Sequence, residues 1–227
     1  MMYNNSHSRS LFSNCLHNAY KWFEHRRRMV GGREKTHCHS GGFMFMCLTA
    51  IACLLMATSC EKAESEFSSH RVRFLYDNSI LFDETLATAL NSLSPGVFVR
   101  VWMSCNYYYF EDFRKQPTQQ PVMERDRLSA FIIGLYNESG IIVGFGNLDN
   151  PPIFFAYDAQ CPNCYSETSL PRYLLTMKSN GIAVCGRCHR EYNLNNHGIV
   201  TKGDAGKKLE RYHASTTGPN GVLTVSN

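Results

Sequence analysis

Two stretches that run from apolar residues into a pair of cysteines dominate the expected fold: FFAYDAQCPNC (154–164) and NGIAVCGRCHREYNL (180–194). Each contains aromatic, β-branched or small apolar residues, which are typical of a buried β-strand. Each strand then ends in a Cys-x-x-Cys turn. If the two strands are neighbours in the fold, both turns meet at one tip and bring four thiols together.

The cysteine spacing indicates a metal site. The pattern reads Cys161-x2-Cys164-x20-Cys185-x2-Cys188. Two such pairs about twenty residues apart fall at the edge of the spacing of zinc sites. Each turn directs two thiolates at one point, and two turns supply the four tetrahedral ligands that Zn²⁺ accepts. Pro162 is expected to stiffen the first turn, and Gly186 to relieve the second.

Other uses of these cysteines stay open at this point. In an oxidising compartment the four thiols could pair as disulfides. Cys185, Cys188 and His189 also have the spacing for covalent haem attachment, but this use leaves Cys161 and Cys164 without a role. His189 is therefore expected to be a surface residue. A thioredoxin-like role requires a Cys-x-x-Cys at the start of a helix, a context that neither pair has.

The rest of the chain is predicted to consist of short strands. One or two helical turns are expected in 82–96, with Asp83 as the N-cap, and 106–127 is expected to be a loop. Cys105 is expected to be a buried thiol at the end of a strand. The predicted strands and hairpins are 70–76, 97–105, 153–159, 180–184, a hairpin within 130–147 and a hairpin within 211–225. Short strands at this spacing predict an all-β sandwich or barrel.

The C-terminal half resembles the cluster-binding part of a Rieske domain, which has two ligand-bearing loops, a Gly-rich segment and a final hairpin. The resemblance covers roughly residues 130–227, and 70–129 would supply the other strands of the same sandwich. It implies a Rieske-like β-sandwich with a two-knuckle cysteine tip. The matching residues beyond the cysteines are Tyr192, Asn193, Leu194, Gly198, Gly203, Leu209, Tyr212 and the closing GVLTV.

The ligands depart from the Rieske pattern. Cys161 and Cys185 stand where the family has its two cysteines. Asn163, followed by Cys164, stands at the first histidine position, and Cys188 stands at the second. Since two imidazoles on one iron give a Rieske centre its raised potential, this property is in doubt here. Zinc is the expected metal, and a low-potential 2Fe–2S cluster or a single iron is the alternative.

The N-terminal part has the pattern of an export signal. A basic segment precedes an uncharged apolar run at 43–57, which suits a signal peptide better than a bilayer span. The sequence ATSC then resembles a bacterial lipobox, with Cys60 as the lipidated residue. A Leu is more usual where Ala57 stands, and an uncleaved signal anchor is the alternative.

These features predict three parts. Residues 1–59 form a signal peptide with an atypical N-terminal extension. Met29 is the alternative translation start, which would leave this extension out. Residues 60–69 form a lipidated tether, and 70–227 form the Rieske-like β domain. The predicted location is the bacterial cell envelope, as an outer-membrane lipoprotein that contacts the membrane through the lipid on Cys60.

Charge and motifs narrow the function. The formal net charge is +4, but residues 1–59 carry +5 and the remainder carries −1. We therefore expect no nucleic-acid partner. No nucleophile–base pair and no paired carboxylates at useful spacing mark a catalytic site. The expected role is non-catalytic binding or scaffolding in the envelope, and the alternative is electron transfer through an iron centre.

Overall fold

The computed structural model describes residues 65–136, 138–165 and 173–227. All of them belong to one compact unit, Ala63–Asn227. The predicted signal peptide, 1–59, and the predicted lipidation site, Cys60, lie outside the described residues. Within the described residues, no helix combines the length and the apolar character needed to cross a membrane.

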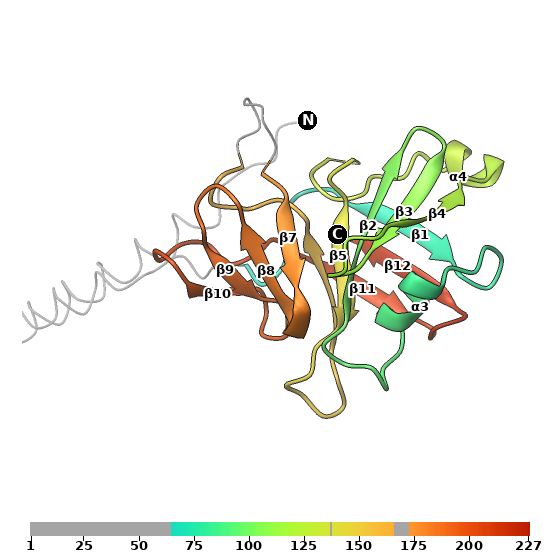
Figure 1. Ribbon diagram of the computed structural model, residues 1–227. Helices are drawn as coiled ribbons and strands as arrows, with labels where there is room; N and C mark the ends of the chain where they lie inside the picture. Colours follow the sequence, from blue (N-terminus) through green and yellow to red (C-terminus); the bar gives the residue numbers. More distant parts are fainter. Residues whose placement is uncertain (1–64, 137, 166–172) are drawn as a thin grey trace, which may run out of the picture. The chain divides into compact units, whose positions relative to one another are not determined.

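The larger of two sheets has eight strands, and it curls so that its ends face each other (Figure 1). The strands are, in spatial order, β1 (Arg73–Asp77), β12 (Val222–Ser226), β11 (Arg211–Thr216), β6 (Phe154–Asp158), β5 (Ile141–Phe145), β2 (Phe98–Ser104), β3 (Tyr107–Glu111) and β4 (Thr118–Pro121). Rings from β1 and β3 meet across the core: the Phe74 and Tyr108 centroids lie 5.8 Å apart, and those of Tyr76 and Phe110 lie 5.0 Å apart. The prediction of an all-β fold is confirmed.

Two short helices complete this part. Helix α3 (Glu84–Ala89) begins where predicted, because the Asp83 carboxylate accepts a hydrogen bond from the Leu86 N–H at 2.9 Å and caps its first turn. Leu86 and Ala89 are buried in the core of the curled sheet. Helix α4 (Glu124–Leu128) buries none of its side chains.

The smaller sheet carries the cysteines. Its strands run in the order β10-β9-β8-β7. They are β7 (Leu175–Lys178), β8 (Ile182–Cys185), β9 (Glu191–Asn193) and β10 (Ile199–Lys202), with a 3-10 turn η1 (Ser179–Gly181) between β7 and β8. The chain beyond β6 pairs with the start of β7: the Cys161 N–H donates to the Tyr173 carbonyl and the Leu175 N–H to the Ala159 carbonyl, both at 2.9 Å. Since Leu175 lies opposite Cys185, the two cysteine pairs fall at the same end of neighbouring strands.

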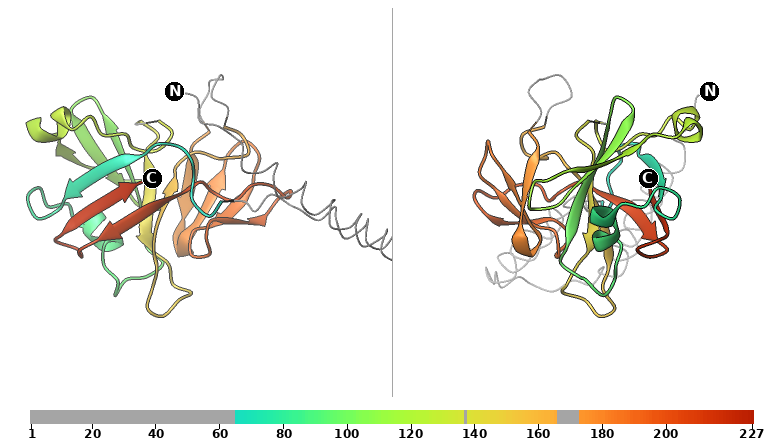
Figure 2. Two further views of the ribbon diagram at one scale, coloured as in Figure 1. Left: turned by 180° about the vertical axis from the view of Figure 1, so that it is seen from behind. Right: turned by 45° about the vertical axis from the view of Figure 1, so that its right-hand side comes forward.

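The central strands of the larger sheet, β2, β5 and β6, contribute residues to two cores, and one of their faces packs against the smaller sheet (Figure 2). Alternate residues therefore point into different cores. Those that face the curled-sheet core are Val99, Val101, Ile141, Val143 and Ala156. Those that face the core shared with the smaller sheet are Phe98, Ile142, Phe155 and Tyr157. This double burial explains the unbroken apolar run in β5.

Two predictions about local structure were wrong. The segment 131–136 does not pair with 141–145 as a hairpin; β5 pairs instead with β2 and β6. Ile132 forms only an isolated bridge to Arg73 of β1, and Ile133 is buried in the core. The predicted loop 106–127 contains β3, β4 and α4.

Cys105 is also not where it was expected. It lies in the tight turn between β2 and β3 with a φ of 53°, and it is exposed rather than buried. The turn was missed because neither Cys105 nor Asn106 is a glycine, the usual residue at a positive φ.

Residues 65–69, the end of the predicted tether, pack against the β domain. The Phe67 ring stacks on His213 with centroids 3.7 Å apart, and the Ser68 N–H donates to the Arg211 carbonyl at 2.7 Å. The Arg211 guanidinium lies over the Phe67 ring and pairs with Glu66. This end of the tether is therefore held by specific contacts.

Candidate metal centre

The four predicted ligands come together at one point. Their Sγ atoms all lie within 4.8 Å of one another. The Cys161 and Cys188 sulfurs are 3.6 Å apart, and those of Cys164 and Cys185 are 3.8 Å apart. A tetrahedral zinc ion with Zn–S bonds of about 2.3 Å separates its sulfurs by about 3.8 Å. The arrangement therefore has the size of a four-thiolate site around one ion.

Backbone hydrogen bonds shape both turns. In the first, the Cys164 N–H donates to the Cys161 carbonyl at 3.1 Å; in the second, the His189 N–H donates to the Cys185 carbonyl at 3.0 Å. The expected role of Gly186 is wrong, since its φ is not positive and a Cβ there would meet nothing within 4 Å. The left-handed residue is His189, with a φ of 57°. His189 is exposed, as predicted.

The four thiols differ in burial and acidity. Cys161 and Cys185 are buried, whereas Cys164 and Cys188 are partly exposed. Burial raises the pKa of the Cys161 thiol well above its usual range and that of Cys164 to about 11. Burial also opposes ionisation of Cys188, but the backbone N–H and the guanidinium of Arg190 outweigh it and lower the pKa to about 6. The raised pKa values of Cys161 and Cys164 mean that a bound cation would favour their ionisation, and metal binding would release their protons.

A tyrosine and an asparagine support the first turn. The Tyr192 hydroxyl is buried 3.1 Å from Cys161 Sγ, and it accepts a hydrogen bond from Asn163 Nδ2 at 2.9 Å. Its own proton is thus available to the sulfur. Asn163 also binds both backbone groups of Lys207, each at 2.9 Å. Asn163 is therefore an anchor of the first turn rather than a metal ligand.

Arg190 supports the second turn. Its Nε donates to the Asp204 carbonyl at 2.9 Å and its terminal nitrogen to the Ala205 carbonyl at 3.1 Å. The same guanidinium lowers the pKa of the Cys188 thiol. The segment 203–207 is thereby attached to both cysteine turns. The spacing of cysteines predicted the four ligands, but no sequence signal marked Asn163, Arg190 or Tyr192 as their supports.

The haem and disulfide uses have different standing. The thiols of Cys185 and Cys188 each lie beside a cysteine of the first turn. The four thiols therefore form one cluster, whereas haem attachment would use Cys185 and Cys188 alone. All four are free thiols in the structure.

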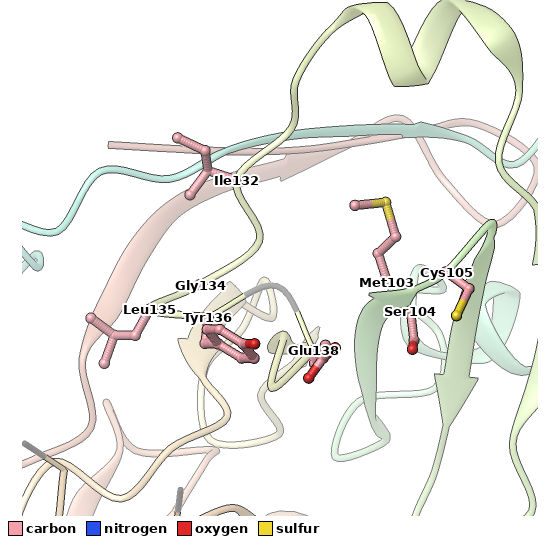
Figure 3. A pocket seen from close by; sticks show the side chains of 8 residues that line it. All are labelled: Met103, Ser104, Cys105, Ile132, Gly134, Leu135, Tyr136 and Glu138. Atoms are coloured by element: carbon pink, nitrogen blue, oxygen red, sulfur yellow. The ribbon is translucent and has the colours of Figure 1, made fainter. Parts of the chain in front are cut away.

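A separate cavity of about 460 Å³ opens between the β2–β3 turn and the segment 132–138 (Figure 3). Its lining is Met103, Ser104, Cys105, Ile132, Gly134, Leu135, Tyr136 and Glu138. None of the metal-centre cysteines lines it. Within the described residues, the four cysteines are the only cluster of three or more side chains suited to hold a metal ion.

Comparison with known protein families, curated proteins and solved structures gives no match. The chemistry of the cysteine centre therefore carries the functional argument.

Proposed function

We propose that this chain is an exported, lipid-anchored cell-envelope protein with a non-catalytic binding or scaffold role, in which Cys161, Cys164, Cys185 and Cys188 hold one structural zinc ion. The observation that carries the zinc proposal is the set of sulfur separations. Two pairs that join different turns are separated by 3.6 and 3.8 Å, close to the edge of a tetrahedron around zinc.

The compactness of the cluster favours one ion over two. A 2Fe–2S cluster distributes its four thiolates over two irons, which separates one thiolate pair from the other. Here every pair of sulfurs lies within 4.8 Å. The Rieske-like topology itself stays a proposal, and it rests on the order of the motifs in the sequence.

A zinc ion at this point would join the connection that leads from β6 of the larger sheet to β7 of the smaller sheet with the connection between β8 and β9. In small zinc peptides, metal binding contributes on the order of 10 kcal/mol to folding. Here the metal would stabilise the end of the smaller sheet at which the two Cys-x-x-Cys turns meet.

The test is metal content and an absorption spectrum of the full chain, purified under reductant without added metal. About one zinc per chain and no visible colour are expected. Cys188→Ser should lower both the zinc content and the free energy of unfolding, whereas Cys105→Ser should change neither, because Cys105 is exposed and outside the site. A Cys188→Ser variant with unchanged unfolding would contradict a structural role.

A second candidate is electron transfer through a single Fe(Cys)₄ centre. It is favoured by the partial exposure of Cys164 and Cys188, which would give a partner access to one edge of the metal. Arg190, which lowers the pKa of the Cys188 thiol, is the kind of polar neighbour that tunes iron–sulfur potentials. Iron with visible absorption bands would replace the zinc proposal by this one.

The envelope location is proposed from the sequence pattern around Cys60. Mass spectrometry of the membrane fraction should find a diacylglyceryl-modified Cys60 at the mature N-terminus. A soluble, unmodified chain that retains residues before Cys60 would contradict it.

A further inference from the structure

Residues 65–69, called here the docked segment, contact one edge of β11 at Arg211. The pairing of β12 with β11 begins at His213 and so stops short of this point. The Glu210 carbonyl accepts from the Asp158 N–H on the β6 side, and because successive carbonyls of an extended chain point to opposite edges, the Arg211 carbonyl faces away from β6. The Ser68 N–H donates to it at 2.7 Å. The docked segment therefore contacts a sheet edge in the way that a bound peptide does in β-augmentation.

The Arg211 guanidinium is the centre of this contact. It lies between the Phe67 ring of the docked segment and the Phe155 ring of β6, at 4.9 and 4.8 Å from their centroids. One terminal nitrogen pairs with the Glu66 carboxylate and lies 2.9 Å from His197 Nδ1. The Arg211 side chain is only 10% exposed, and a cation held against aromatic rings binds more strongly when it is shielded from water.

The aromatic ring of the docked segment has a second partner. The Phe67 ring stacks on the His213 imidazole with centroids 3.7 Å apart. Three consecutive residues thus make three different contacts: Glu66 gives a carboxylate, Phe67 gives a ring and Ser68 gives a backbone N–H. The site on β11 is therefore complementary to an acidic residue followed by an aromatic one.

The docked segment leaves part of this site unused. A cavity of about 170 Å³ lies between residues 65–69 and 208–211. Arg211 lines it, and in the described part of the chain the buried Arg211 Nε has no hydrogen-bond partner. A guanidinium can bind both oxygens of a carboxylate through two parallel N–H groups. A ligand from another chain could therefore use one donor that Glu66 does not.

We propose that β11 carries a peptide-binding site for an acidic–aromatic segment of a partner protein, and that residues 66–68 occupy this site as a tethered competitor. A bound partner segment takes the place of Glu66, Phe67 and Ser68 against Arg211 and His213. This inference rests on the proposed binding role, to which it gives a partner of stated chemistry, and it does not depend on the metal centre.

The probe for this site is a hexapeptide with the sequence of residues 65–70, SEFSSH, labelled with a dye at its N-terminus. Fluorescence anisotropy measures its affinity for the full chain, as wild type and as the double variant Glu66→Ala/Phe67→Ala. A site that its own segment fills about nine-tenths of the time or more has its apparent affinity lowered about tenfold or more. We expect the double variant to bind the probe more tightly than wild type by this factor.

A milder variant covers the case in which the double variant folds poorly. Glu66 is more than half exposed, so Glu66→Gln loosens the docked segment without removing buried surface. It should bind the probe with an affinity between those of wild type and the double variant. Equal affinities of wild type and Glu66→Gln would overturn the proposal.

Changes in the peptide test recognition without altering the protein. Replacing its Glu by Gln, or its Phe by Ala, should each weaken binding to the double variant about tenfold. In the protein, Arg211→Gln added to the double variant should weaken the probe by about the same factor or more. Arg71→Gln is the matched control, because Arg71 is exposed, and its affinity should stay within about twofold.

Failure of this proposal is distinct from failure of the metal site. If the double variant binds the probe no better than wild type does, or no better than it binds the peptide without Glu and Phe, the peptide site falls. Zinc content measured on the same samples should be the same in all variants. A chain that binds zinc but discriminates no peptide loses only this inference, and one that binds the peptide without zinc loses only the metal site.

Discussion

Replacing Tyr192 by Phe tests the support of the metal centre with the loss of one oxygen atom. The hydroxyl lies 3.1 Å from Cys161 Sγ and 2.9 Å from Asn163 Nδ2. Asn163 keeps its two bonds to Lys207, so no buried donor loses its only partner. The main loss is the hydrogen bond to the sulfur. When a bonded partner is ionised, such a bond contributes about 1.5–3 kcal/mol.

This loss applies to the zinc-bound state, in which Cys161 is a thiolate. We therefore expect Tyr192→Phe to weaken zinc binding about tenfold to a hundredfold, the range found when an outer-shell partner of a metal ligand is removed. The assay is competition for zinc against a chromophoric chelator at pH 7. The unfolding free energy of the metal-free chain should fall by only about 1 kcal/mol, because a neutral thiol is a weaker acceptor.

Tyr212→Phe is the matched control. It also removes a buried hydroxyl, which donates to the Asp158 carboxylate at 3.0 Å. Tyr212 lies in the core of the curled sheet, whereas Tyr192 and the cysteines belong to the other core. Tyr212→Phe should lower stability without changing zinc affinity. The reasoning is refuted if Tyr192→Phe binds zinc within twofold of wild type, or if both variants weaken zinc equally.

Three further predictions follow from single positions. Burial raises the pKa of Asp158 to about 6, although hydrogen bonds from Leu135, Gln160 and Tyr212 lower it. Because the folded pKa exceeds the unfolded one, the stability that this group contributes is present at low pH and is lost as pH rises through about 6. The loss is about 3 kcal/mol in all and about 1 kcal/mol between pH 5 and 7. Urea unfolding at both pH values should show wild type losing this amount relative to Asp158→Asn, and parallel pH profiles would contradict it. Gly206→Ala should speed tryptic cleavage at Lys207, since the new Cβ would clash with Asn163 Oδ1, whereas Gly186→Ala should leave both zinc affinity and unfolding unchanged within about 0.5 kcal/mol, because nothing lies within 4 Å of its Cβ position. Val143→Ala, at a fully buried position of β5, should lower the free energy of unfolding by about 1–3 kcal/mol, and a loss below about 0.5 kcal/mol would contradict the burial of Val143 in the curled-sheet core.

The sequence predicted strands wherever alternation or a buried run was bounded by turn residues. The β11–β12 hairpin is such a case, and helix α3 was predicted separately from its Asp83 cap. Prediction failed where pairing is not local. The apolar run 131–136 looks like half of a hairpin with β5, but β5 finds its partners in β2 and β6. Periodicity reports burial, and it does not identify the neighbour.

The site was predictable to the same extent. Cys-x-x-Cys spacing identifies ligands because the turn geometry is local, and the pairing of Leu175 with Cys185 then aligns the two turns. The supports of the site, Asn163 and Arg190, bond the loop 203–207 that follows β10. No local sequence pattern predicts these contacts. The domain total of −1 also concealed an uneven distribution: residues 173–227 hold seven Lys and Arg but three Asp and Glu.

The most direct test of the account is the metal itself. X-ray absorption at the metal edge, together with elemental analysis of the full chain purified under reductant, should find about one zinc per chain bound by four sulfurs at about 2.3 Å. Iron with a second iron in its near shell would make the centre a cluster and contradict the single-ion account. A chain without metal, whose four thiols resist alkylation until reduced, would contradict the metal centre altogether.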